Sequence, residues 1–181
     1  QPQTDQVCQN GTTPDLEIIL DSSENATYQW YENSVDNNTT GSPINGEENS
    51  SFSPPTDSIG ETFYYVVITF PSGVCNDIIS QTALIQVNEI PTITNVPNNQ
   101  SICSGSETAL INLTASPIAA TFSWSSNSPA GLTGFIDSGS SDTIPIQTLV
   151  NTTQDPITLI YTILPHYGQC TGSPVNVEII V

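Results

Sequence analysis

The stretch Ala26-Thr27-Tyr28-Gln29-Trp30 returns later in the chain as Ala120-Thr121-Phe122-Ser123-Trp124. In each copy two aromatic residues alternate with one polar residue, so both rings lie on the same side of an extended strand. Large aromatic side chains are usually buried, which predicts that Trp30 and Trp124 are core residues. The alternative is a stacking platform for sugars. Recurrence in two otherwise diverged copies favours packing over a shared ligand.

The four cysteines of the chain bracket these two copies. The spacing within each pair is 67 residues and the repeat period is 95 residues, the first pair being Cys8 and Cys75 and the second Cys103 and Cys170. A repeat of this length in a chain of 181 residues predicts two domains, residues 1–89 and residues 90–181.

The cysteine pattern favours disulfides over metal ligation. There is no Cys-x-x-Cys motif and only one histidine, which argues against zinc and iron–sulfur sites. One pair per repeat predicts the bonds Cys8–Cys75 and Cys103–Cys170, with no free thiol. These bonds would staple one end of each domain, because the cysteines precede the first inner strand and follow the last hairpin turn. Disulfides indicate an oxidising compartment outside the cytosol.

The chain has no Lys or Arg and 18 acidic residues, for a formal net charge of −18. Binding to nucleic acid or to anionic lipid requires cationic side chains, so both functions are excluded. A Lys–Asn isopeptide crosslink is excluded for the same reason. No apolar run reaches 18 residues, so no membrane insertion is expected. We expect a self-repelling, monomeric fragment of a longer exported protein.

Many short runs of strand-forming residues, separated by turn residues, predict an all-β fold of two tandem immunoglobulin-like β-sandwich domains. No segment shows a helical stripe. Polar turns are expected at 21–25, 71–73 and 166–168, and a long polar excursion at 33–51 with an edge strand near Pro43 and Ile44. The expected strands are 16–20, 26–30, 62–70 and 78–87 in the first repeat and 109–115, 121–125, 143–147, 156–164 and 174–181 in the second.

Longer motifs carry a family resemblance over nearly the whole chain. The first module resembles the Ig-like repeats of very large Bacteroidetes cell-surface adhesins, through Tyr28-Gln29-Trp30-Tyr31, Gly41-Ser42-Pro43-Ile44, Phe52-Ser53-Pro54-Pro55 and Thr62-Phe63-Tyr64-Tyr65-Val66-Val67. The second resembles their PKD-like repeats, through Ile102-Cys103-Ser104-Gly105, Phe122-Ser123-Trp124, Gly131-Leu132-Thr133-Gly134-Phe135, Ile144-Pro145-Ile146-Gln147-Thr148-Leu149-Val150-Asn151 and Gly168-Gln169-Cys170-Thr171-Gly172.

The resemblance implies a stalk or adhesive segment at the bacterial cell surface, exported by type 9 secretion and used in surface attachment or gliding motility. Its partners would be neighbouring repeats of the same chain and a surface polysaccharide or other external substratum. The alternative is a carbohydrate-binding or spacer module of a secreted polysaccharide-degrading enzyme. The resemblance also implies O-glycosylation signals, Asp-Ser/Thr followed by an apolar residue, with Ser58 and Thr143 as acceptors.

Residues that could carry catalysis or hold a cofactor are few. His166 is expected in an exposed turn without a nucleophile motif, and Glu47 and Glu48 are adjacent carboxylates that rarely converge on one bond. The chain is therefore not expected to be an enzyme, and no cofactor is expected. Calcium is the metal to consider, because it prefers oxygen ligands. Its weak candidates are Asp36 in an Asn-rich loop, Glu47, Glu48 and Glu89 at the domain junction.

Overall fold

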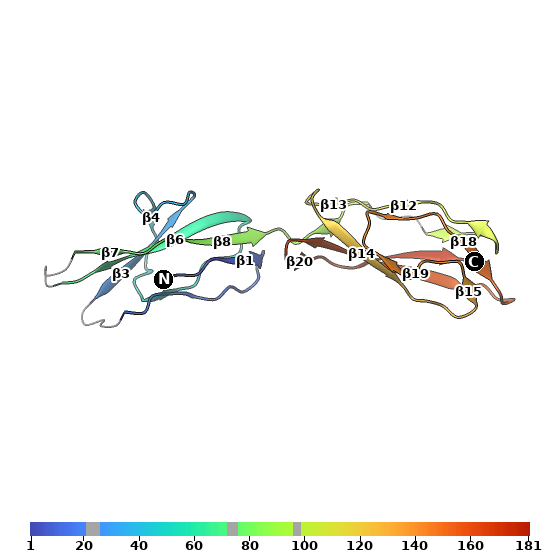
Figure 1. The fold of residues 1–181 in the computed structure, drawn as a ribbon, viewed down its shortest axis with the longest axis horizontal. Helices are drawn as coiled ribbons and strands as arrows, with labels where there is room; N and C mark the ends of the chain where they lie inside the picture. Colours follow the sequence, from blue (N-terminus) through green and yellow to red (C-terminus); the bar gives the residue numbers. More distant parts are fainter. Residues whose placement is uncertain (21–25, 72–75, 96–98) are drawn as a thin grey trace. The chain divides into compact units, whose positions relative to one another are not determined.

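The computed structural model describes residues 1–20, 26–71, 76–95 and 99–181 (Figure 1). Every regular element in this part of the chain is a β-strand, so the predicted all-β fold is confirmed. The described residues contain no helix long and apolar enough to cross a membrane. The chain divides into two compact units, Gln1–Asn88 and Glu89–Val181. The turn expected at 21–25 lies outside the described residues.

The first unit is built around a sheet in the order β1-β8-β6-β3-β4, with β7 also paired to β6. The outer strand β1 runs parallel to β8, and the other pairs are antiparallel. A second layer is formed by β2 and β5. The strands are β1 (Asp5–Cys8), β2 (Leu16–Glu17), β3 (Thr27–Asn33), β4 (Ser42–Pro43), β5 (Ser51–Phe52), β6 (Gly60–Thr69), β7 (Ile78–Ile79) and β8 (Ala83–Asn88).

The core of the first unit lies between these two layers. Alternation along β6 turns Tyr64, Val66 and Ile68 inward, where they join Trp30 of β3 and Phe52 of β5. The predicted returning strand 78–87 is divided into β7 and β8. Ser80 causes the division, because its hydroxyl accepts the Val66 N–H at 3.0 Å and replaces a backbone partner.

The second unit repeats this plan. Its main sheet has the order β10-β21-β19-β14-β16, with β20 paired to β19, and β10 runs parallel to β21. Opposite it lie the groups β11-β18-β15, β12-β17 and β13-β9. The strands are β9 (Thr92–Ile93), β10 (Gln100–Ser101), β11 (Ser106–Glu107), β12 (Ile111–Asn112), β13 (Ala115–Ser116), β14 (Thr121–Ser126), β15 (Leu132–Thr133), β16 (Ser138–Gly139), β17 (Thr143–Ile144), β18 (Thr148–Asn151), β19 (Thr158–Tyr167), β20 (Cys170–Thr171) and β21 (Val175–Ile180).

Strict alternation in β19 buries Leu159, Tyr161, Ile163 and Pro165 on one side of the sheet. Leu159, Tyr161 and Ile163 pack with Trp124 of β14 in a core that is separate from that of the first unit. A domain of about 90 residues is long enough to bury a hydrophobic core of its own.

Candidate functional site

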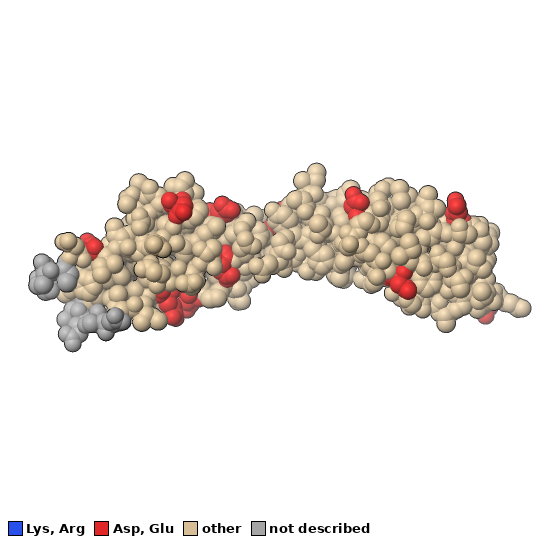
Figure 2. All heavy atoms as spheres, in the orientation of Figure 1, with Lys and Arg blue, Asp and Glu red and all other residues tan. Residues whose placement is uncertain are grey.

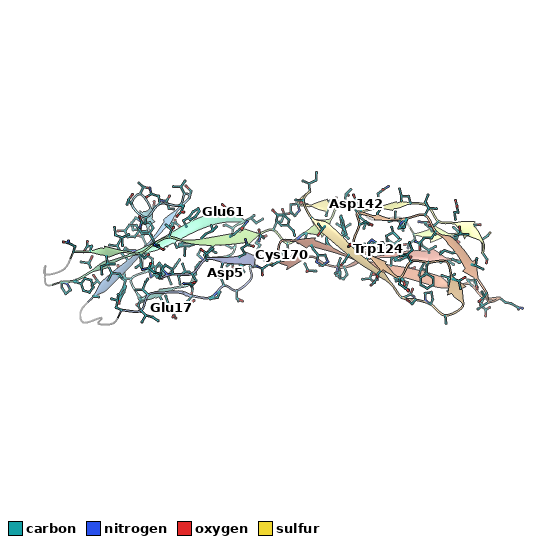
Figure 3. All side chains as sticks on the ribbon, in the orientation of Figure 1. Asp5, Glu17, Glu61, Trp124, Asp142 and Cys170 are labelled. Atoms are coloured by element: carbon teal, nitrogen blue, oxygen red, sulfur yellow. The ribbon has the colours of Figure 1, made fainter. Side chains whose placement is uncertain are left out.

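The cysteines lie at the ends of strands. Cys8 ends β1, and Cys170 begins β20 (Figure 3). The Cys170 side chain is 1% exposed. Both residues are disulfide-bonded. Cys103, in the turn after β10, is an exposed free thiol. Cys75 lies outside the described residues.

The predicted bond between Cys103 and Cys170 is wrong, because the two residues lie at opposite ends of the second unit. Cys103 follows Ile102, whose N–H donates to Ile180 O at 2.9 Å, and Ile180 is paired with Thr158 at the start of β19. Cys170 is paired with Tyr167 at the other end of that strand. Thr158 and Tyr167 are nine residues apart along β19, which corresponds to about 30 Å of extended strand. The Cα atoms of disulfide-bonded cysteines lie about 7 Å apart at most.

The two tryptophans belong to the two cores. Trp30 is 0% exposed, its indole N–H donates to Asn49 O at 2.9 Å, and its ring packs on Phe52 at a centroid distance of 5.6 Å. Trp124 is 5% exposed and meets the edge of the Tyr161 ring, with an interplanar angle of 88°. Neither ring presents a face to solvent, so neither serves as a sugar platform.

Beneath Trp124, a buried polar network involves Gln147 and Tyr161. The Tyr161 hydroxyl lies 2.9 Å from Gln147 Oε1 and 3.0 Å from Ile136 O, and these two acceptors share its single proton. Gln147 Oε1 also accepts the Ile136 N–H at 2.6 Å. Burial raises the pKa of Tyr161 above its usual 10.0, and the hydrogen bonds to Gln147 and Ile136 act in the opposite direction. This network fixes the loop before β16 to the centre of the main sheet.

The carboxylates proposed for calcium are not brought together. Among the residues that the structure describes, no group of three or more His, Cys, Asp or Glu side chains could hold a metal ion. Asp36 Oδ1 accepts a hydrogen bond from the Thr82 hydroxyl, and Glu89 Oε1 accepts one from Ser116 at 3.1 Å. Glu47 is half-buried and Glu48 is exposed. On the face in Figure 2, acidic side chains form small separate groups.

The two glycosylation candidates differ in accessibility. Ser58 is exposed, in the connection between β5 and β6, where a sugar could be attached without disturbing a strand. Thr143 is half-buried in β17 and paired with Asn112. A glycan there would have to displace part of a sheet, so geometry favours Ser58 of the two.

The structure places His166 in strand β19 and half-buried, not in the predicted turn. Its Nε2 lies 2.7 Å from Ser123 Oγ, and its Nδ1 lies 3.1 Å from Thr171 Oγ1. Sequence analysis missed this Ser–His pair; the register of β14 against a longer β19 would have revealed it. A serine nucleophile also needs a group that stabilises the imidazolium, and Thr171 supplies only a neutral hydroxyl. We interpret the three side chains as a structural hydrogen-bond network that joins β14, β19 and β20.

The surface hollows differ between the units. The first unit has a surface pocket of about 460 Å³ that is lined only by polar side chains and backbone, including Glu32 and Glu61. The second unit has a surface pocket of about 530 Å³ whose lining includes Leu113, Ile118 and Phe122. Tyr31 is a half-exposed aromatic ring, and it stacks at 5.1 Å on buried Tyr65.

Comparisons with known proteins agree with this architecture. Residues 100–181 match the model of the PKD-like domain, and residues 2–89 match that of a domain of unknown function (DUF8696). No curated protein sequence matches the chain.

Solved structures of immunoglobulin domains share the fold. The I-band fragment I67–I69 from titin has a TM-score of 0.54 at 12% identity, covering 99% of this chain and 62% of that one. Sidekick-1 immunoglobulin domains 1–5 have a TM-score of 0.53 at 13% identity, covering 98% of this chain and 37% of that one. The chain thus spans less than two thirds of either structure. The predicted PKD-like character of the second repeat is confirmed: the chain carries tandem β-sandwich units of the Ig-like and PKD-like type.

Proposed function

We propose that the chain is a stalk or adhesive segment of a secreted bacterial cell-surface adhesin. The observation that carries the proposal is the tandem arrangement of two Ig-like or PKD-like sandwiches with disulfide-bonded cysteines. Modules of this type are common in extracellular adhesion and spacing, and disulfides persist outside the cytosol. The fold is typical of non-catalytic modules.

The finer assignment rests on the sequence motifs. They resemble repeats of large Bacteroidetes surface adhesins, and among these the gliding-motility adhesin SprB is the model for the proposed role. In such a protein these modules would be exported by the type 9 system and joined to further repeats. The complete gene is then expected to encode more modules at a spacing of about 95 residues. A gene in which these two modules adjoin a polysaccharide hydrolase would instead support the alternative.

A stalk requires that consecutive modules be held apart. Strand β8 ends at Asn88 and β9 begins at Thr92, so only Glu89, Ile90 and Pro91 connect them. A short connection containing proline and no Gly/Ser run acts as a stiff spacer. The acidic side chains, which have no Lys or Arg to pair with, also oppose close association of modules.

Small-angle scattering from the 181-residue chain tests the stalk. Two modules with a radius of gyration of about 12 Å each, arranged end to end with centres roughly 36 Å apart, give about 22 Å. A compact globule of this length has about 16 Å. A value near 16 Å would remove the physical basis of the stalk.

The carbohydrate-binding alternative has less support from the described residues. Both tryptophan rings are buried, and Tyr31 already has one ring face against Tyr65. A stacking site would leave several aromatic faces open to a sugar chain. Glycan-array binding that survives at physiological salt and is lost in Tyr31→Ala would favour the alternative; a Tyr28→Ala variant in the same strand serves as the control.

A further inference from the structure

Two Asn–Gly dipeptides occur in the chain, Asn10-Gly11 and Asn45-Gly46, and both lie in the first unit. In such a dipeptide the backbone nitrogen of glycine can attack the side-chain amide of the preceding asparagine, because glycine has no Cβ to restrict its backbone. Asparagine is accordingly one of the thermolabile residues of proteins. We propose that Asn45 is a site of spontaneous deamidation in the folded chain, whereas the fold of the first unit protects Asn10.

Asn45 and Gly46 are the two middle residues of an exposed turn between β4 and β5. The Ile44 carbonyl accepts the Glu47 N–H at 3.2 Å and closes the turn. Gly46 has a φ of 86°, as the third residue of a type II turn requires, and a Cβ placed on it would meet no atom within 4 Å. Among the residues that the structure describes, neither the Gly46 N–H nor the Asn45 side chain has a hydrogen-bond partner. The attacking nitrogen and the amide are therefore both free to move.

The other dipeptide, Asn10-Gly11, is held by its surroundings. The Gly11 N–H donates to Cys8 O at 2.7 Å, and the Gly11 carbonyl accepts the Thr56 hydroxyl at 2.7 Å. The Asn10 N–H donates to Thr56 O at 2.8 Å. A Cβ placed on Gly11 would lie 2.8 Å from Cys8 O and 2.9 Å from Val7 Cγ2, so the Gly11 backbone is closely packed. The Gly11 nitrogen would have to give up its bond to Cys8 before it could attack the Asn10 amide.

The reaction needs only water. The Gly46 nitrogen forms a bond to Asn45 Cγ, the bond from Cγ to Nδ2 breaks, and Nδ2 leaves as ammonia with the proton of the Gly46 N–H. The product is a cyclic imide, and water then opens either of its carbonyls. One opening gives aspartate, and the other gives isoaspartate, in which the backbone runs through Cγ and gains one carbon atom. Both products carry a new carboxylate beside Glu47 and Glu48.

Isoaspartate at this position would disturb the attachment of the turn to the core. The Trp30 N–H donates to Glu47 O at 3.0 Å, and the Trp30 carbonyl accepts the Ile44 N–H at 2.9 Å. One core residue therefore fixes both ends of the turn. A backbone that is longer by one atom between Ile44 and Glu47 no longer matches this spacing. We expect the modification to weaken the first unit at the edge of its main sheet, where β4 pairs with β3.

Incubation of the oxidised 181-residue chain in mildly alkaline buffer tests the selectivity. Samples are reduced, digested with Glu-C and analysed by mass spectrometry, which detects the change from amide to carboxylate in the peptides 1–17 and 33–47. We expect Asn45 to deamidate about tenfold faster than Asn10, a factor that corresponds to about 1.4 kcal/mol and lies within the net contribution of one hydrogen bond. Equal rates, or faster loss of the Asn10 amide, would overturn the proposal.

The same incubation in concentrated urea separates the effect of the fold from that of the local sequence. Unfolding removes the bond between Gly11 and Cys8, so the rates at Asn10 and Asn45 should become similar. If Asn45 reacts faster by the same factor in urea, the local sequence selects it and the fold does not, and the proposal is wrong.

Two variants at position 45 measure the consequence for stability. Asn45→Gln keeps an amide but forms a cyclic imide much more slowly, and Asn45→Asp adds the charge without lengthening the backbone. After incubation, the unsubstituted chain should lose about 0.5 M from the urea midpoint of the first unit, followed by the indole N–H signal of Trp30 in NMR spectra. The incubated Asn45→Gln chain and the fresh Asn45→Asp chain should keep their midpoints, and the Trp124 signal should report no change in the second unit. An equal loss in the incubated Asn45→Gln chain would refute the assignment to this turn.

Discussion

Replacing Tyr161 by phenylalanine tests the polar network in the second unit. The ring and its edge contact with Trp124 are kept, and only the hydroxyl is lost. Gln147 Oε1 retains the Ile136 N–H as a donor, whereas the Ile136 carbonyl loses the bond from Tyr161. An acceptor left without a partner in a buried setting costs about 1–3 kcal/mol. Because Ile136 is partly exposed, we expect the lower part of this range, about 1–2 kcal/mol.

Urea denaturation followed by two-dimensional NMR measures this effect. Each unit contains one tryptophan, so the indole N–H signals of Trp30 and Trp124 report the two units separately. With a urea dependence of about 1–3 kcal/mol per molar, the Trp124 midpoint should fall by about 1 M while that of Trp30 stays unchanged. The control is Tyr167→Phe, the same change at a half-buried position of β19. Equal shifts in the two variants would refute the proposed role of the hydroxyl.

Four further outcomes are expected. Burial raises the pKa of Tyr64 and Tyr161 above 10.0. Above pH 10.0 the folded chain therefore keeps hydroxyl protons that the unfolded chain has lost, and the free energy of unfolding should fall as the pH rises. Urea midpoints that do not change in this pH range would contradict the prediction. Trp30→Ala and Trp124→Ala should each destabilise their own unit by about 3–5 kcal/mol, and unchanged melting temperatures would argue against core packing. The EDTA-treated chain should give neither heat nor thermal shift with millimolar calcium, whereas saturable heat absent with magnesium would establish a calcium site. Trypsin should leave the chain intact even in urea, because there is no Lys or Arg to cleave after, and fragments on a gel would disprove it.

Alternation in the sequence was sufficient to locate the main strands. Trp30 and Trp124 lie on inward-facing positions of β3 and β14, where the aromatic spacing places them. Strands β6 and β19 follow the two most regular apolar runs. These elements are predictable because burial of one face imposes a period of two on the side chains.

Other features depend on pairing across the chain. Strand β1 contains one buried residue, Val7, and gives no periodic signal; its position is set by parallel bonding to β8. The end of β7 depends on the Ser80 hydroxyl, which no local pattern distinguishes from other serines. The cysteine pairing was wrong for Cys103 because equal spacing gives no information about which end of a strand each cysteine occupies. The Ser123–His166 contact was missed because the hairpin turn lies beyond His166.

The parallel pairing of the first and last main-sheet strands in each unit has a mechanical consequence. When the ends of a module are pulled, tension enters β1 at its beginning and leaves β8 at its end, so their hydrogen bonds are loaded together in shear. Four residue pairs share this load in the first unit and two in the second, β10 against β21. Once the disulfides are reduced, the second unit should therefore rupture at the lower force.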